Sequence, residues 1–147
     1  MKLTLIFVLV GTLAVSPLAA EKKVKLESLP AAVQAAVKEQ TQGATLVGVS
    51  KEKEKGKTVY EIEMKVGGKT RDLTVDAAGQ IVLDEVEVEI STIPAAAREA
   101  IEKKAASGKI KLVEKITQAG SVRYEAQIEK GRKTSEFTVN ADGTVYK

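Results

Sequence analysis

Apolar and polar residues alternate along several stretches of the chain. Residues 58–66 read TVYEIEMKV, so that Tyr60, Ile62, Met64 and Val66 fall on every second position. A period of two predicts a β-strand with one face toward a core and the other toward solvent. The same alternation recurs at 71–75, 82–90, 122–130 and 135–139. Alternation of this kind is typical of an antiparallel sheet that is covered on one face only.

Two other stretches carry apolar residues at helical spacing. Each opens on a proline, which suits the first helical turn because its missing N–H has no partner there in any case. Ser28 and Thr92 stand just before these prolines as candidate caps. We therefore expect helices that begin near residues 30 and 94. Their inward-facing residues are Val33, Ala36 and Val37 in the first and Ala97, Ala100 and Ile101 in the second.

The whole pattern occurs twice. Residues 29–83 align with residues 93–147 without a gap, placing Tyr60-Glu61 on Tyr124-Glu125 and Gly79 on Gly143. Each unit reads as a helix followed by four strands. We therefore predict an α+β protein of two tandem α-β-β-β-β repeats, with one antiparallel sheet of about eight strands and both helices on one face.

The repeats set the domain boundaries, at 29–91 and 92–147, after a charged lead-in at 21–28. Residues 1–20 have the order of a secretory signal peptide: Lys2, an apolar run, a helix-breaking Ser16-Pro17 and small residues at the end. We expect cleavage after Ala20 and export, which makes the protein periplasmic or secreted. An uncleaved N-terminal anchor is the alternative. No membrane association is expected once the signal is removed.

The residue composition excludes several kinds of functional site. The chain has no His and no Cys, the residues on which most zinc, copper and iron sites and most activated nucleophiles depend. The formal charge of +3 and the 3% aromatic content argue against nucleic-acid binding. Abundant Glu would permit a carboxylate-pair glycosidase, but sugar-stacking aromatics are scarce. We predict no enzyme activity, no catalytic residue, no metal site and no cofactor.

The sequences DAAG at 76–79 and NADG at 140–143 end the third strand of each repeat. Asp or Asn followed by Gly is typical of a tight turn, since the side chain bonds its own backbone and glycine accepts positive φ. The alternative is a calcium loop, which requires further oxygen ligands and a distal Glu. Only four residues follow Gly143, so the turn is preferred.

The Leu/Ile-Pro-Ala-Ala helix start, the Tyr-Glu pair, the glycine turn and the final Leu/Phe-Thr-Val-Asp/Asn-Ala-x-Gly resemble the PepSY-like domains. More narrowly, the chain resembles the tandem family of beta-lactamase-inhibitor-like proteins, over nearly all of residues 21–147. The resemblance implies an exported bacterial protein. It also implies a protein partner, for which a peptidase is one candidate, held by the open face of the sheet.

The residue composition and the family resemblance both favour a non-enzymatic binding module. The polar positions of the strands predict which residues line the open face, although alternating charges also describe a merely solvated face. The predicted partner-binding residues are Glu61, Glu63, Lys65, Asp72, Arg123, Glu125, Gln127 and Glu136.

Two further expectations follow from the alternation. Glu85, Glu87 and Glu89 occupy alternate positions about 7 Å apart along one strand, which offers a second function, binding of a cation or small molecule by an acidic stripe. Tyr60 and Tyr124 each begin an apolar alternation, so we expect both rings to be buried beneath the helices rather than to form a functional site.

Overall fold

The computed structural model describes residues 22–147. The first repeat contains α1 (Ala31–Gln40), β2 (Thr45–Glu54), β3 (Lys57–Val66), β4 (Lys69–Asp76) and β5 (Ile81–Glu87). The second contains α2 (Ala95–Ala105), β6 (Lys109–Gln118), β7 (Ser121–Lys130) and β8 (Lys133–Asn140). A two-residue strand, β1 (Lys22–Lys23), and the short 3-10 turns η1 (Leu26–Ser28) and η2 (Ile90–Thr92) precede the helices.

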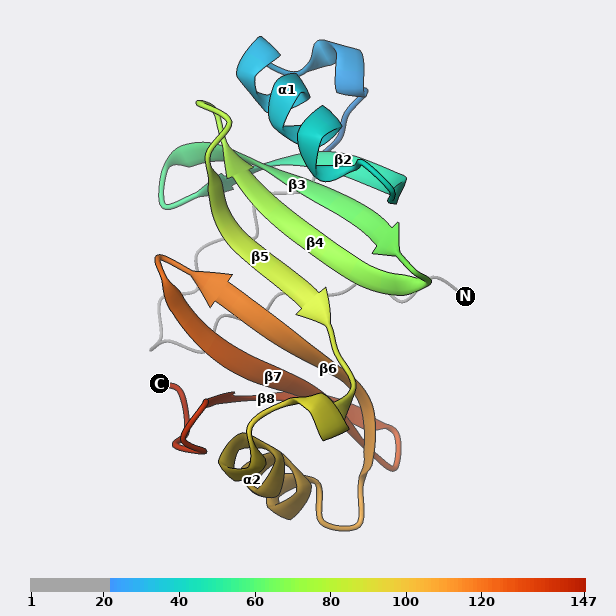
Figure 1. Ribbon diagram of the computed structural model, residues 1–147, viewed down its shortest axis with the longest axis vertical. Helices are drawn as coiled ribbons and strands as arrows, with labels where there is room; N and C mark the ends of the chain where they lie inside the picture. The colour runs from blue at the N-terminus through green and yellow to red at the C-terminus, as the bar shows by residue number, and fades with distance from the viewer. Residues whose placement is uncertain (1–21) are drawn as a thin grey trace.

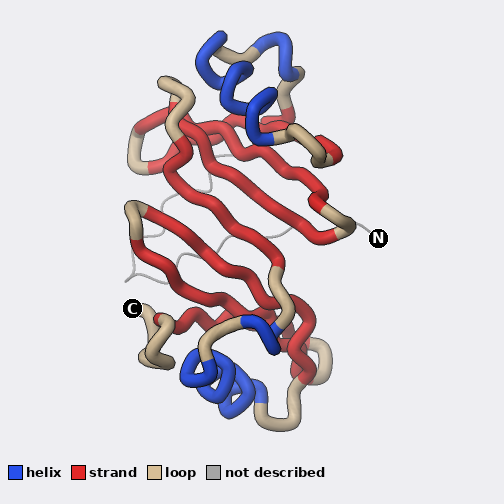
Figure 2. Tube along the Cα trace, viewed as in Figure 1, coloured by secondary structure: helices blue, strands red, loops and turns tan. Residues whose placement is uncertain are grey.

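The strands form a single sheet in chain order, β1 to β8 (Figure 2). Every neighbouring pair is antiparallel, including β1–β2 and β5–β6, which are connected through a helix instead of a hairpin. The two repeats join where β5 pairs with β6, over Asp84–Glu87 and Glu114–Thr117. The predicted α+β architecture with one eight-stranded antiparallel sheet is confirmed.

Both helices lie on the same face of this sheet. Cross-strand pairing joins the core side of the first repeat to that of the second in one continuous row. This row contains Met64, Arg71, Val86, Lys115 and Tyr124. Figure 1 shows α1 against the first repeat and α2 against the second, at opposite ends of the sheet.

Each helix encloses its own core. Val33 and Val37 of α1 pack with Ile62, Met64 and Leu73. In the second repeat the equivalent core contains Ala97, Ile101, Ala126, Ile128 and Val139. The molecule therefore has two hydrophobic cores on one side of one sheet.

An ion pair fixes the C-terminal end of α1 to the sheet. The Arg71 guanidinium donates through Nε and Nη2 to the two carboxylate oxygens of Asp84, at 3.0 and 2.9 Å. Nη2 also donates to Gln40 Oε1 at 3.1 Å. The bidentate geometry is the favourable one for Arg with a carboxylate, and Asp84 raises the pKa of Arg71 further.

The repeated DAAG and NADG corners are tight turns, as predicted. The amide N–H of Gly79 donates to the Asp76 carbonyl at 3.0 Å, and Gly143 does the same to Asn140 at 2.9 Å. Both glycines have φ of +83°. A Cβ at either position would stand 2.6 Å from a helix carbonyl oxygen, that of Ala32 or Ala96. The corner therefore needs glycine for its backbone angle and because it abuts the first turn of the helix.

Several sequence-based details were wrong. The run of alternating charges at 51–57 does not form a loop, since β2 continues to Glu54 and only Lys55-Gly56 turns. The second repeat lacks a full fourth strand and keeps only a bridge between Val139 and Val145. The eighth strand is β1, from the charged lead-in. Ser28 and Thr92 do not cap the helices. Their hydroxyls donate instead to the carbonyl oxygens of Lys25 and Glu89, at the short turns η1 and η2.

Both tyrosines occupy the predicted core positions. Tyr60 is 6% exposed and packs in the first core, and Tyr124 is 9% exposed and packs in the second. The predicted strand register is thereby confirmed. The remaining boundary prediction, a signal peptide over residues 1–20, lies outside the residues that the structure describes.

Candidate functional site: the open face of the sheet

The face of the sheet opposite the helices, here called the open face, is covered by no helix of residues 22–147. Cross-strand pairing places all eight predicted site residues on it. On the first repeat Glu61 pairs with Thr74 and Glu63 with Asp72, and on the second Glu125 pairs with Thr138 and Gln127 with Glu136. Lys65 and Arg123 lie at the same alternation on β3 and β7. The sequence therefore assigned these residues to the correct face.

Their exposure differs from that of an evenly wetted surface. Lys65 is exposed, most of the others are half-buried, and Gln127 is only 9% exposed. Gln127 lies between Leu112 of β6 and Glu136 of β8 in the register. Arg123 is also engaged, since its guanidinium stacks on the Tyr146 ring at 4.7 Å from the centroid.

Carboxylates gather where the two repeats meet. Asp72 pairs with Glu85 across β4 and β5, and Glu114 pairs with Glu125 across β6 and β7. Because β5 pairs with β6, these two acidic pairs become neighbours on the open face. With Glu61 of β3, the set makes up what we call the carboxylate cluster: Glu61, Asp72, Glu85, Glu114 and Glu125.

Burial and repulsion between carboxylates raise the pKa of three members of this cluster, Asp72, Glu85 and Glu114. Glu85 and Glu114 are each 5% exposed. Burial, and then the charge of Glu114, raises the pKa of Glu85 to about 9. Burial, followed by the charges of Asp72 and Glu125, raises that of Glu114 to about 7. Asp72 has its pKa raised to about 6 by burial and by Glu63.

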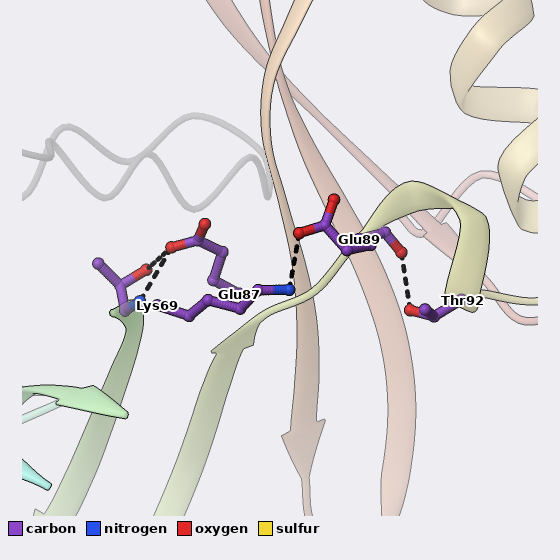
Figure 3. A network of polar contacts seen from close by, with 5 residues as sticks. Lys69, Glu87, Glu89 and Thr92 are labelled. Carbon is purple, nitrogen blue, oxygen red and sulfur yellow. Dashed lines mark hydrogen bonds and ion pairs between the residues drawn. The ribbon is translucent and has the colours of Figure 1, made fainter. Parts of the chain in front are cut away.

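The predicted acidic stripe of Glu85, Glu87 and Glu89 is divided by the structure. The Glu87 carboxylate accepts hydrogen bonds from the Thr70 N–H and hydroxyl, both at 2.9 Å, which lower its pKa. Glu89 lies beyond the end of β5 and pairs with Lys69 at 2.8 Å (Figure 3). Only Glu85 belongs to the carboxylate cluster.

The geometry of the described carboxylates does not suit a metal ion. Within residues 22–147, no group of three or more acidic side chains is arranged to hold one. In the NADG turn, Asp142 instead accepts hydrogen bonds from the Thr144 N–H at 2.9 Å and hydroxyl at 2.6 Å. The calcium alternative therefore finds no support at this turn.

Two buried polar residues of the open face escaped the sequence analysis. Glu114 was missed because a bulge between Ile110 and Leu112 interrupts the alternation of β6. Ser50, at the equivalent place in the first repeat, is 3% exposed, and its hydroxyl has no hydrogen-bond partner. Each residue directly follows a core valine, Val113 or Val49, which is the signal that could have placed them on the opposite face.

Apolar side chains and a small hollow accompany these polar groups. Ile116, which pairs with Glu85 and Arg123, is 2% exposed. A hollow of about 40 Å³ lies between β2 and β5, lined by Glu52, Glu54, Val59, Glu61, Thr74 and Leu83. A larger cleft of about 440 Å³ lies at the β1–β2 edge, lined by Lys22, Val24, Ser28, Leu29, Lys51, Glu52, Lys53 and Tyr60. That cleft is away from the carboxylate cluster.

Comparison with known protein families gives a match for the first repeat. Residues 30–90 match the family model described as peptidase propeptide and YPEB domain, PepSY. The first repeat thus matches the PepSY family, and the predicted PepSY-like resemblance is confirmed. No curated protein sequence matches the chain. Among residues 22–147, no helix has the length and apolarity needed to span a bilayer.

Solved structures share the fold of both repeats together. One, described as periplasmic, comes from Bacteroides eggerthii, at 17% identity and a TM-score of 0.66, covering 81% of this chain and 86% of that one. A DUF2874 family protein from Bacteroides uniformis has 17% identity and a TM-score of 0.63, covering 80% and 86%. A BLIP-like protein from Bacteroides fragilis has 18% identity and a TM-score of 0.57, covering 79% and 82%.

The carboxylate cluster makes stability depend on pH. Glu85, Glu114 and Asp72 have raised pKa values in the folded state, so the folded protein binds more protons than the unfolded chain. Stability from these groups is full below the unfolded pKa and is lost as pH rises through the folded values. We expect the melting temperature to fall between pH 5 and pH 9.

The variant Glu85→Gln tests whether the carboxylate cluster causes this pH dependence of stability. It removes a carboxyl group whose ionisation is unfavourable in the fold, so it should stabilise the protein at pH 9 by about 2–4 kcal/mol and have little effect at pH 5. Thermal unfolding across this range measures both. Glu99→Gln, at an exposed site on α2, should follow the wild-type profile. Equal profiles for all three proteins would contradict the assignment.

Proposed function

We propose that the protein is an exported, non-enzymatic module that binds a protein partner through its open face. The observation that carries the proposal is the continuity of this face: β2 to β8 present polar side chains from both repeats, while both helices lie on the other side. A broad face of rigid strands offers the area that stable protein contacts require.

The comparisons support this proposal without naming a partner. The family description of residues 30–90 refers to peptidase propeptides, and one structure of the same fold is described as BLIP-like. A peptidase is therefore the first partner class to test. The signal-like residues 1–20, together with the periplasmic description of a protein of the same fold, support a location in the periplasm or outside the cell.

Site-specific photocrosslinking in the native exporting host tests the proposal. A photoreactive residue at Lys65 or Glu136 samples the open face in each repeat, and one at Glu99 samples the helical side. We expect the same discrete crosslinked protein from both open-face positions and none from Glu99. Crosslinks from Glu99 alone, or no crosslink from the open face, would contradict the proposed function.

A further inference from the structure

The carboxylate cluster gathers five acidic side chains on one face of a protein that is basic overall. The chain has 23 Lys and Arg against 20 Asp and Glu, yet the five members of the cluster occupy adjacent strands β3 to β7 on one face. Among the described residues, neither Glu85 nor Glu114 forms an ion pair. Arg123, the nearest cation in the register, stacks on Tyr146.

A second observation also points to ligand binding on this face. The Ser50 hydroxyl is buried on the open face beside Glu61, its cross-strand partner, and has no hydrogen bond. A buried hydroxyl without a hydrogen-bond partner is unfavourable, because it has lost its hydrogen bonds to water. A ligand that brings a hydrogen-bond donor to this side of the cluster would satisfy it.

Apolar residues between the carboxylates indicate which kind of cationic ligand fits this face. Ile116 pairs with Glu85, while Val59 and Leu83 line the adjoining hollow. Lysine and arginine side chains match this mixture, because their methylene stems pack on apolar surface while their charged ends donate hydrogen bonds to carboxylates. A metal ion matches it poorly, since it requires several oxygens converging at one point.

Building on the proposed function, we propose that the open face binds an extended lysine- or arginine-rich segment of its protein partner, with cationic side chains seated on Glu85, Glu114 and Glu125. The segment crosses the junction of the repeats, and one of its donors reaches Ser50.

Binding of the basic segment is coupled to the release of protons. Glu85 faces Glu61, Asp72, Glu114 and Glu125, and in the free protein burial and these charges keep it protonated at neutral pH. A bound cation favours the carboxylate, so protons leave as the segment binds. Affinity therefore rises from pH 6 to pH 9, the reverse of the trend in stability.

Titration of the purified chain with a fluorescent ten-residue oligolysine peptide tests the proposal. Fluorescence anisotropy at pH 8 and low salt should show binding, which an oligoglutamate peptide should not. Glu85→Gln, Glu114→Gln and Glu125→Gln combined should weaken binding at least tenfold. The matched control neutralises Glu39, Glu99 and Glu102, all exposed on the helices, and should change affinity less than twofold.

Calorimetry in two buffers of different ionisation enthalpy should also detect proton release with wild type, at a lower level in the open-face variant. Equal loss of binding in both triple variants would overturn the proposal, because it would mean that only net charge matters. So would the absence of oligolysine binding. If oligolysine does not bind while open-face photocrosslinks persist, the proposal of a basic segment is refuted and the proposed function stands. If the crosslinks are absent too, both are refuted.

Discussion

Replacing Gly79 or Gly143 with alanine is expected to lower the free energy of unfolding by about 2–5 kcal/mol. Two costs combine. Positive φ at +83° is unfavourable by about 1–2 kcal/mol for a residue with a Cβ. The new methyl group would also meet the carbonyl oxygen of Ala32 or Ala96 at 2.6 Å, and relieving such a clash costs about 1–3 kcal/mol.

Gly120 provides the matched control. Its φ is +78°, but a Cβ there would have nothing within 4 Å. Gly120→Ala should therefore show the backbone cost alone, about 1–2 kcal/mol. Chemical denaturation of the three variants separates the two costs. If Gly79→Ala were no more destabilising than Gly120→Ala, the close approach of turn and helix would not matter to stability.

Truncation of Tyr60 or Tyr124 to alanine should cost about 3–5 kcal/mol, as for other large aromatic residues in cores. Each ring is nearly buried in the core of its own repeat, and each change leaves a cavity beneath a helix. The open face lies on the other side of the strands. Denaturant unfolding measures the loss, and oligolysine binding below the unfolding transition should be retained.

Tyr146 serves as the control because its ring is 48% exposed. Tyr146→Ala should cost less than about 1 kcal/mol, the size of an exposed cation–π contact. A small effect at Tyr60 and Tyr124 as well would mean that the rings do not support the cores, contrary to their burial.

The sequence predicted the repeated architecture because its signals are local. Alternation assigns each residue of a strand to one of two faces, so the eight open-face residues and the two core tyrosines could be placed from their neighbours alone. The glycine corners were recognised from turn chemistry. Their contact with the helix was not, because it joins residues far apart in the chain, such as Ala32 and Gly79.

The carboxylate cluster depends on the same kind of distant pairing. Alternation shows that Glu85 and Glu125 each point away from a core, but only the β5–β6 pairing brings their two strands to either side of β6 on one face. Glu114 was hidden by the bulge in β6. The strand β1 could not be foreseen either, since Lys22 and Lys23 have no apolar pattern and are held by pairing with Ser50 and Lys51.

The narrow junction between the repeats has a consequence for synthesis. The first core contains only residues of the first repeat, so it can form while the ribosome is still producing the second. During that interval the outer edge of β5 has no neighbour, and an unpaired edge invites pairing with another nascent chain. The Glu87 carboxylate lies on that edge, and a charged side chain on an edge strand opposes its pairing with another copy until β6 takes the position.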